Sequence, residues 1–197
     1  MTSAASGMSQ IEAANRVMHR TPGVLIEIIG GQMLATPSPE IAHTRALKKV
    51  TRAFEAAGLG QDGTEVHRSI GVWLPDDPED YAIPDLCIVD AEVDDRLVEN
   101  NCYDPVVFRL VLEVTSSNWK ADLRTKVTAY AQAKIPVYAI VDRQHQRLHV
   151  LTDPAEGAYA NHRVHAPGEL VTLPDTLGAK VTLDVAEILK AGQPQAD

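Results

Sequence analysis

The sequence predicts one α/β (or α+β) domain with a mixed central β-sheet flanked by helices. Two kinds of segment predict it. Apolar runs such as VVFRLVLEV at 106–114 and VYAIVD at 137–142 are typical of buried strands. Between the runs lie amphipathic segments, at 38–58 and 120–134, whose apolar residues recur at helical spacing. The length of 197 residues fits one domain better than two.

The domain is expected to span residues 21–190, between flexible tails at 1–20 and 191–197. An amino-terminal β-hairpin should turn at Gly30–Gly31, because paired glycines suit a tight turn. The helix that follows should have Ser38 as N-cap, Pro39 at its first position and Gly58 as its stop. Further strands are expected at 64–75, 83–90, 106–116 and 137–142, with the 120–134 helix ended by Pro136. The last part should be β-rich, and a short helix should cap it at 182–192.

Composition excludes several classes of protein. Hydrophobic residues make up 45% of the chain and charged residues 23%, which is not the composition of a disordered or fibrous protein. The net charge of −9 argues against a non-specific nucleic-acid coat protein. Cys87 and Cys102 have neither disulfide-framework nor zinc-site spacing, so a reducing cytoplasm is expected. No apolar run approaches the ~18–20 residues of a membrane span.

Two carboxylates stand where a metal site could form. Asp85 begins one predicted strand, and Glu113 lies near the end of the most apolar one. Carboxylates on neighbouring strands can hold Mg²⁺, which neutralises a phosphodiester and acidifies a water molecule. Both have simpler explanations, since Asp85 could cap a turn and Glu113 could be partly solvated at a strand end.

Lys126 follows on the next helix, where an ammonium could stabilise charge on the reacting phosphate. Asp122 lies four residues before it. An ordinary exposed ion pair across one helical turn would explain the same spacing.

These spaced motifs together resemble the Uma2 family of putative restriction endonucleases, within the PD-(D/E)XK nuclease superfamily. The matching residues extend over about 22–152, and comprise Ile26-Glu27 to Gly30, Ser38-Pro39 with His43, Pro84-Asp85, Glu113-Val114-Thr115-Ser116, Asp122/Lys126/Tyr130 and Val141-Asp142.

The resemblance implies a restriction-endonuclease-like core and a metal-dependent DNA endonuclease, with DNA as partner. Asp85 and Glu113 would bind Mg²⁺, or Mn²⁺ in its place, with the Val114 backbone carbonyl as a further ligand. In this superfamily the lysine usually lies two residues after the glutamate. Thr115 stands there, so the resemblance implies that Lys126 reaches the site from the helix.

Three further residues are possible auxiliaries. The resemblance implies that Glu27 adds a carboxylate, although it could equally be a satisfied glutamate at a strand edge. His43 could face the site or a subunit boundary, or simply be packed on its helix. Asp122 is interpreted as a group that orients the second helix.

A second hypothesis is a catalytically inactive nuclease-fold module for binding or oligomerisation. The acidic net charge favours it, as does the lack of a separate target-recognition domain. Arg45, Lys48, Lys49 and Arg52 share one side of the first long helix, either as a phosphate-facing strip or as a solvated face. A homodimer without membrane contact is expected, because edge strands need covering.

Overall fold

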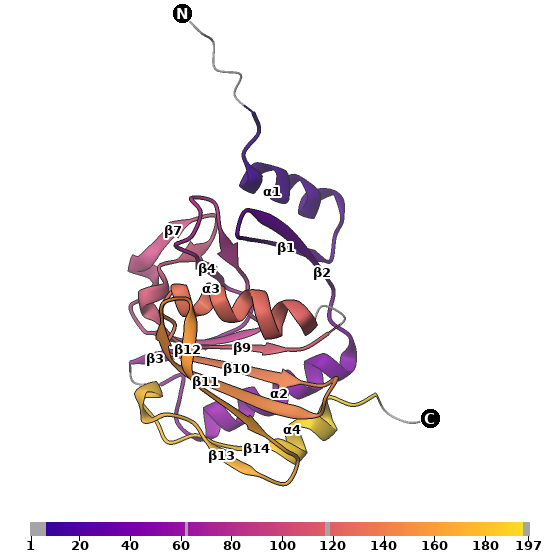
Figure 1. Cartoon of the computed structure of the whole chain (residues 1–197), viewed down its shortest axis with the longest axis vertical. Helices are drawn as coiled ribbons and strands as arrows, with labels where there is room; N and C mark the ends of the chain where they lie inside the picture. Colours follow the sequence, from indigo (N-terminus) through magenta and orange to yellow (C-terminus); the bar gives the residue numbers. More distant parts are fainter. Residues whose placement is uncertain (1–6, 62, 117–118, 195–197) are drawn as a thin grey trace, which may run out of the picture.

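The computed structural model describes residues 7–61, 63–116 and 119–194, and its main feature is a pair of six-stranded sheets. The central sheet has the order β12-β11-β10-β9-β6-β3, and the amino-terminal sheet the order β2-β1-β5-β4-β8-β7. A two-stranded sheet, β13-β14, completes the described part (Figure 1).

The strands of the central sheet are β3 (Thr64–His67), β6 (Leu86–Asp90), β9 (Phe108–Val114), β10 (Val137–Asp142), β11 (Arg147–Ala155) and β12 (Ala158–His165). Those of the amino-terminal sheet are β1 (Val24–Ile29), β2 (Gln32–Pro37), β4 (Gly71–Trp73), β5 (Tyr81–Ala82), β7 (Leu97–Glu99) and β8 (Cys102–Tyr103). The small sheet consists of β13 (Leu170–Thr172) and β14 (Thr182–Asp184), and short 3₁₀ turns span Val93–Arg96, Pro105–Val107 and Asp175–Leu177.

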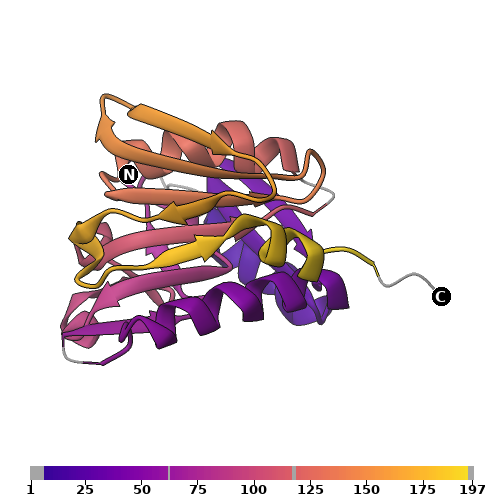
Figure 2. The same cartoon turned by 90° about the horizontal axis from the view of Figure 1, so that it is seen from below.

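The central sheet is mixed and covered on both faces, as the sequence predicts. β9 and β10 run parallel, whereas the other neighbours in this sheet are antiparallel. The helix α3 (Lys126–Gln132) covers one face, and α2 (Ile41–Ala56) and α4 (Val185–Ala191) cover the other (Figures 1 and 2). The β-rich carboxyl-terminal part extends this sheet through β11 and β12.

The alternation of side chains along β9 decides where its carboxylate points. Leu110, Leu112 and Val114 pack with α2 and α4 in one core cluster, whereas Val111 packs with α3 in another. Successive strand residues face opposite sides of a sheet. Glu113 therefore faces α3, on the side of the sheet opposite α2 and α4.

The first long helix begins later than the sequence predicts. α2 starts at Ile41 with Glu40 as its N-cap residue. The predicted cap, Ser38, instead donates its hydroxyl to the Gly23 carbonyl at 2.8 Å. That bond ties the helix entry to the start of β1, so the cap prediction is wrong although the helix and its end near Gly58 are confirmed.

The single strand predicted at 64–75 is two strands in different sheets. Ser69 adopts a φ of +55° between them, and its N–H donates to the Pro84 carbonyl at 3.2 Å. β3 then pairs with β6 in the central sheet, and β4 with β5 in the other. An alternating pattern continues across this break, so it hides the change of sheet.

Both predicted tails are too long. The helix α1 (Gln10–Arg20) carries a capping box between Ser9 and Glu12 and buries Ile11 and Ala14 against the β1 hairpin. Its apolar face anchors residues predicted to be flexible. At the other end, the Gly192 carbonyl accepts from Arg143 Nε at 2.7 Å, so the chain stays packed past residue 191. Residues 1–6 and 195–197 lie outside the described residues.

The predicted hairpin is confirmed, and a buried aspartate fixes its turn. Gly30 and Gly31 have φ of +60° and +68°, as a tight hairpin turn requires. The carboxylate of Asp80 is fully buried and accepts from both glycine N–H groups, at 2.6 and 3.0 Å. Asp80 therefore holds the hairpin against the loop before β5.

We predict that Asp80→Ala lowers the free energy of unfolding by about 2–4 kcal/mol, because two backbone donors lose a charged acceptor. Urea denaturation measures the change. Asp76→Ala, on an exposed position of the same loop, is the matched control and should change stability by less than about 0.5 kcal/mol. Equal effects of the two substitutions would contradict this role of Asp80.

Candidate active site

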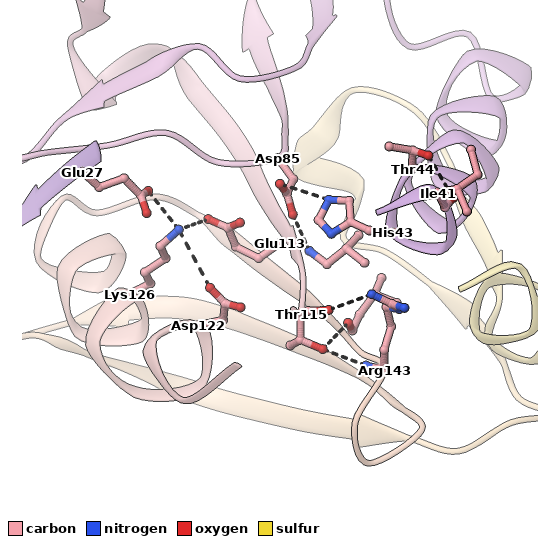
Figure 3. Close-up of polar contacts among 12 residues, drawn as sticks. Glu27, Ile41, His43, Thr44, Asp85, Glu113, Thr115, Asp122, Lys126 and Arg143 are labelled. Atoms are coloured by element: carbon pink, nitrogen blue, oxygen red, sulfur yellow. Dashed lines mark hydrogen bonds and ion pairs between the residues drawn. The ribbon is translucent and has the colours of Figure 1, made fainter. Parts of the chain in front are cut away.

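A buried ammonium lies at the centre of the site. Lys126 Nζ is 2.8 Å from Glu113 Oε1, 2.9 Å from Glu27 Oε1 and 3.8 Å from Asp122 Oδ1 (Figure 3). All four residues are at most 7% exposed. The structure thus excludes the exposed helical pair as an explanation for Lys126, because the side chain joins a helix to strands of both six-stranded sheets.

The helix that carries Lys126 begins with a π-helical segment. Ala121–Thr125 is π-helical and leads directly into α3, with the Lys126 N–H donating to the Ala121 carbonyl. Tyr138 Oη donates to the Asp122 carbonyl at 3.0 Å and holds this turn on the sheet. Such π segments occur often at functional sites. The sequence predicts a helix here but not its π-helical start.

The superfamily's usual lysine position serves another purpose in this chain. Thr115 Oγ1 donates to the Val141 carbonyl at 3.3 Å and accepts from the Arg143 N–H at 2.9 Å. It thereby links the end of β9 to the end of β10. The ammonium beside Glu113 comes from Lys126 instead, as the resemblance implies.

Asp85 approaches the group from the neighbouring strand. Leu86 pairs with Leu112 across β6 and β9, so the same antiparallel register places Asp85 opposite Glu113. Its Oδ2 accepts from the Val114 N–H at 2.8 Å, and its Oδ1 lies 3.3 Å from His43 Nε2. The Asp85 side chain is 26% exposed, so water reaches this carboxylate while Glu113 stays buried.

The auxiliary residues also converge here. Glu27 accepts from the Ile83 N–H at 2.8 Å, which fixes the hairpin carboxylate beside Lys126. His43 is buried on α2, and among the described residues its Nδ1 has no hydrogen-bond partner. The sequence indicates Tyr130 only as part of the motif that it forms with Asp122 and Lys126. Its hydroxyl donates to Glu113 Oε1 at 3.1 Å.

These groups line one cavity of about 550 Å³, which we call the acidic cavity. Its wall includes Glu27, Asp85, Glu113, Asp122 and Lys126, together with His43, Val114, Ser116, Trp119 and Lys120. Every residue nominated from the sequence as catalytic, auxiliary or metal-binding is therefore at this one place.

Burial and charge set the protonation of the group. Burial raises the pKa of Glu113 well above its usual range; Lys126 opposes this, and Asp85 and Asp122 add to it. Burial alone lowers the pKa of Lys126, but Glu113, Glu27 and Asp122 outweigh it and raise that pKa. The ammonium therefore stays charged and holds the carboxylates together.

Asp122 should make stability depend on pH. Burial raises its pKa to about 7, with Asp85 and Glu27 adding to the rise and Lys126 opposing it. Between about pH 4 and 7 the folded state keeps a proton that the unfolded chain has lost, so stability falls as pH rises through this window. We predict that Asp122→Asn is more stable than the natural protein at pH 8, on the order of 1–3 kcal/mol.

Thermal unfolding at pH 5 and pH 8 checks this, and the difference between the two proteins should shrink at pH 5. Asp94→Asn, exposed in the 3₁₀ turn Val93–Arg96, is the control. A pH-independent difference for Asp122→Asn would contradict the raised pKa.

The chain matches a known protein family. The model of the Uma2 family, described as "Putative restriction endonuclease", matches residues 11–186. The chain belongs to the Uma2 family. The matched segment contains every residue of the acidic cavity named above.

A solved structure shares the fold. It is titled as a putative nuclease belonging to DUF820 from Anabaena variabilis, is 13% identical, and superposes with a TM-score of 0.66 over 89% of this chain and 97% of that one. No curated protein matches. Among the described residues, no helix is long and apolar enough to cross a membrane.

Proposed function

We propose that this Uma2 protein is a Mg²⁺-dependent endodeoxyribonuclease that hydrolyses DNA phosphodiester bonds. One observation carries the proposal: a water-accessible carboxylate, Asp85, and a buried carboxylate, Glu113, meet in one cavity with the ammonium of Lys126. The family description and the fold shared with a putative nuclease support it.

The residues present fit magnesium. Among the described residues no group of three or more His, Cys, Asp or Glu is arranged to hold a metal ion. Mg²⁺ is commonly held by one or two carboxylates and keeps several water ligands, so Asp85 and Glu113 suffice. The Val114 carbonyl is proposed as a further oxygen ligand, and Mn²⁺ as a substitute. When bound, the ion would neutralise phosphate charge and acidify a water molecule.

The chain's own residues hold these groups in place. Lys126 donates to Glu113 and faces the acidic cavity, where its ammonium can stabilise charge that develops on the phosphate or orient the attacking water. Tyr130 fixes Glu113 through the same oxygen. His43 contacts Asp85 Oδ1 and orients that carboxylate. Glu27 and Asp122 balance the ammonium until substrate arrives.

A non-catalytic binding module is the second candidate, and the net charge of −9 favours it. The basic strip on α2 offers limited attraction for phosphate, since Lys49 already pairs with Glu187 at 2.9 Å. Lys126 and Lys120, in contrast, both lie in the wall of the acidic cavity. A DNA cleavage assay distinguishes the nuclease from the non-catalytic binding module.

We predict that the purified protein nicks or linearises supercoiled plasmid with Mg²⁺ or Mn²⁺, and that Glu113→Gln and Lys126→Met each lower the rate at least 100-fold. The reason is loss of one metal ligand in the first case and of the ammonium in the second. Gel electrophoresis against time measures the rate.

Lys180→Met, at an exposed position outside the cavity, is the matched control and should cut like the natural protein. All variants are prepared identically to expose a contaminating nuclease. Equal cutting by every variant, or no cutting by any, would favour the non-catalytic module.

Metal binding is tested without DNA. Mg²⁺ or Mn²⁺ that binds the folded state raises Tm in a concentration-dependent way. We predict a rise in the natural protein that disappears in Asp85→Asn and persists in Asp90→Asn, whose aspartate pairs with Arg109 away from the cavity. Stabilisation of Asp85→Asn equal to that of the natural protein would remove Asp85 from the proposed ligand set.

Two broader expectations stay predictions. Cys87 and Cys102 are buried free thiols, and burial raises the pKa of each to about 12, which suits a reducing cytoplasm. Leu97, Val98 and Val106 are exposed apolar residues near the β7 edge, a surface that a homodimer could cover. Light scattering during size exclusion measures the oligomeric state.

A further inference from the structure

A second cavity adjoins the acidic cavity. Its volume is about 670 Å³, within the ~300–1,000 Å³ typical of small-ligand sites. Both cavities are lined by Leu25, Thr36, His43, Asp85, Ser116 and Trp119. A molecule with its phosphate at Asp85 can therefore extend into the second cavity without leaving the protein surface.

An indole ring forms part of the shared wall. The ring of Trp119 meets that of His145 edge-on, with centroids 4.9 Å apart. His145 is held in turn by Asp142, whose buried Oδ2 lies 2.7 Å from His145 Nδ1. The ammonium of Lys120 lies 5.6 Å from the indole centroid. An aromatic ring beside a basic group is what single-stranded nucleic-acid sites use to stack a base and attract its phosphate.

The rest of the second cavity is rich in side-chain amides, those of Gln144, Gln146 and Gln193. Gln193 Nε2 donates to Gln146 Oε1 at 3.0 Å, and Gln146 Nε2 donates to the Arg143 carbonyl at 2.8 Å. Each amide carries two N–H donors and a carbonyl acceptor, so this pair retains groups that match the edge of a base. Glu40, which also lines the cavity, pairs with Arg143 and so adds little repulsion.

We propose that the second cavity binds the base of an unpaired DNA nucleotide, stacked on Trp119, when the adjoining phosphate lies in the acidic cavity. This rests on the proposed function, and it specifies the substrate class as single-stranded DNA or DNA with unpaired nucleotides. A paired base cannot enter such a cavity unless it first leaves the helical stack, which costs free energy.

The two tryptophans of the chain allow a direct test. Trp73 lies in β4 and packs against the buried cluster to which α1 contributes Ile11 and Ala14. Because the chain has two tryptophans, Trp73→Phe leaves Trp119 as its single indole fluorophore. In this variant, (dT)₁₀ added in EDTA should quench the fluorescence saturably. A ten-nucleotide abasic strand should bind at least tenfold more weakly and cause no quenching.

Anisotropy of fluorescein-labelled (dT)₁₀ compares the affinities of the variants. Trp119→Ala should weaken binding about tenfold or more, the range seen for loss of one stacked base, whereas Trp119→Phe should retain most of the affinity. Trp73→Phe should bind like the natural protein. Equal affinity for the abasic strand, full affinity in Trp119→Ala, or equal affinity for a ten-base-pair duplex would overturn the proposal.

The binding experiments are done in EDTA, so their outcome does not depend on metal-dependent hydrolysis. Quenching by (dT)₁₀ without cleavage under Mg²⁺ would retain the nucleotide site and reject the nuclease. Cleavage without quenching would retain the nuclease and reject the nucleotide site.

Discussion

The structure around the site depends on one buried positive charge. An ammonium removed from water is costly unless it is paired and hydrogen-bonded, and Lys126 meets that requirement with carboxylates from three elements. Glu27 comes from the amino-terminal sheet, Glu113 from the central sheet and Asp122 from the π-helical turn. The pairing therefore joins the two sheets and one helix.

The same pairing bears on the proposed function, because the chain carries a net charge of −9 and a phosphodiester is also negative. Lys126 offsets the carboxylates where the substrate phosphate would lie, and a divalent ion would offset the rest. Asp85 differs from Glu113 in being open to water, so the two carboxylates combine an accessible ligand with a rigidly held one. Trp119 and the neighbouring amides lie just beyond Asp85, where the next part of a nucleotide would fall.

The sequence predicts the layers of this fold well and its local departures poorly. The apolar run of β9 and the apolar stripe of α3 predict that these elements are buried, and the spaced motifs predict which residues meet. The positive φ of Ser69 is not predictable, because nothing in the alternating pattern marks the change of sheet there. The motif indicates Tyr130 as a residue of the helix, but its hydroxyl contact with Glu113 depends on how the helix packs against β9, which the sequence does not specify. A hydroxyl before a helix predicts that Ser38 is a cap, whereas its partner is a carbonyl 15 residues earlier in the chain.

In the proposed function, Asp85 and Glu113 together hold a divalent ion beside Lys126. The most direct measurement is a crystal structure of the protein grown with Mn²⁺, with anomalous diffraction data to locate the metal. We expect one anomalous peak in the acidic cavity, with oxygens of Asp85 and Glu113 at about 2.1 Å, close to the Mg–O distance. Manganese bound elsewhere, or an acidic cavity without metal at saturating Mn²⁺, would contradict it.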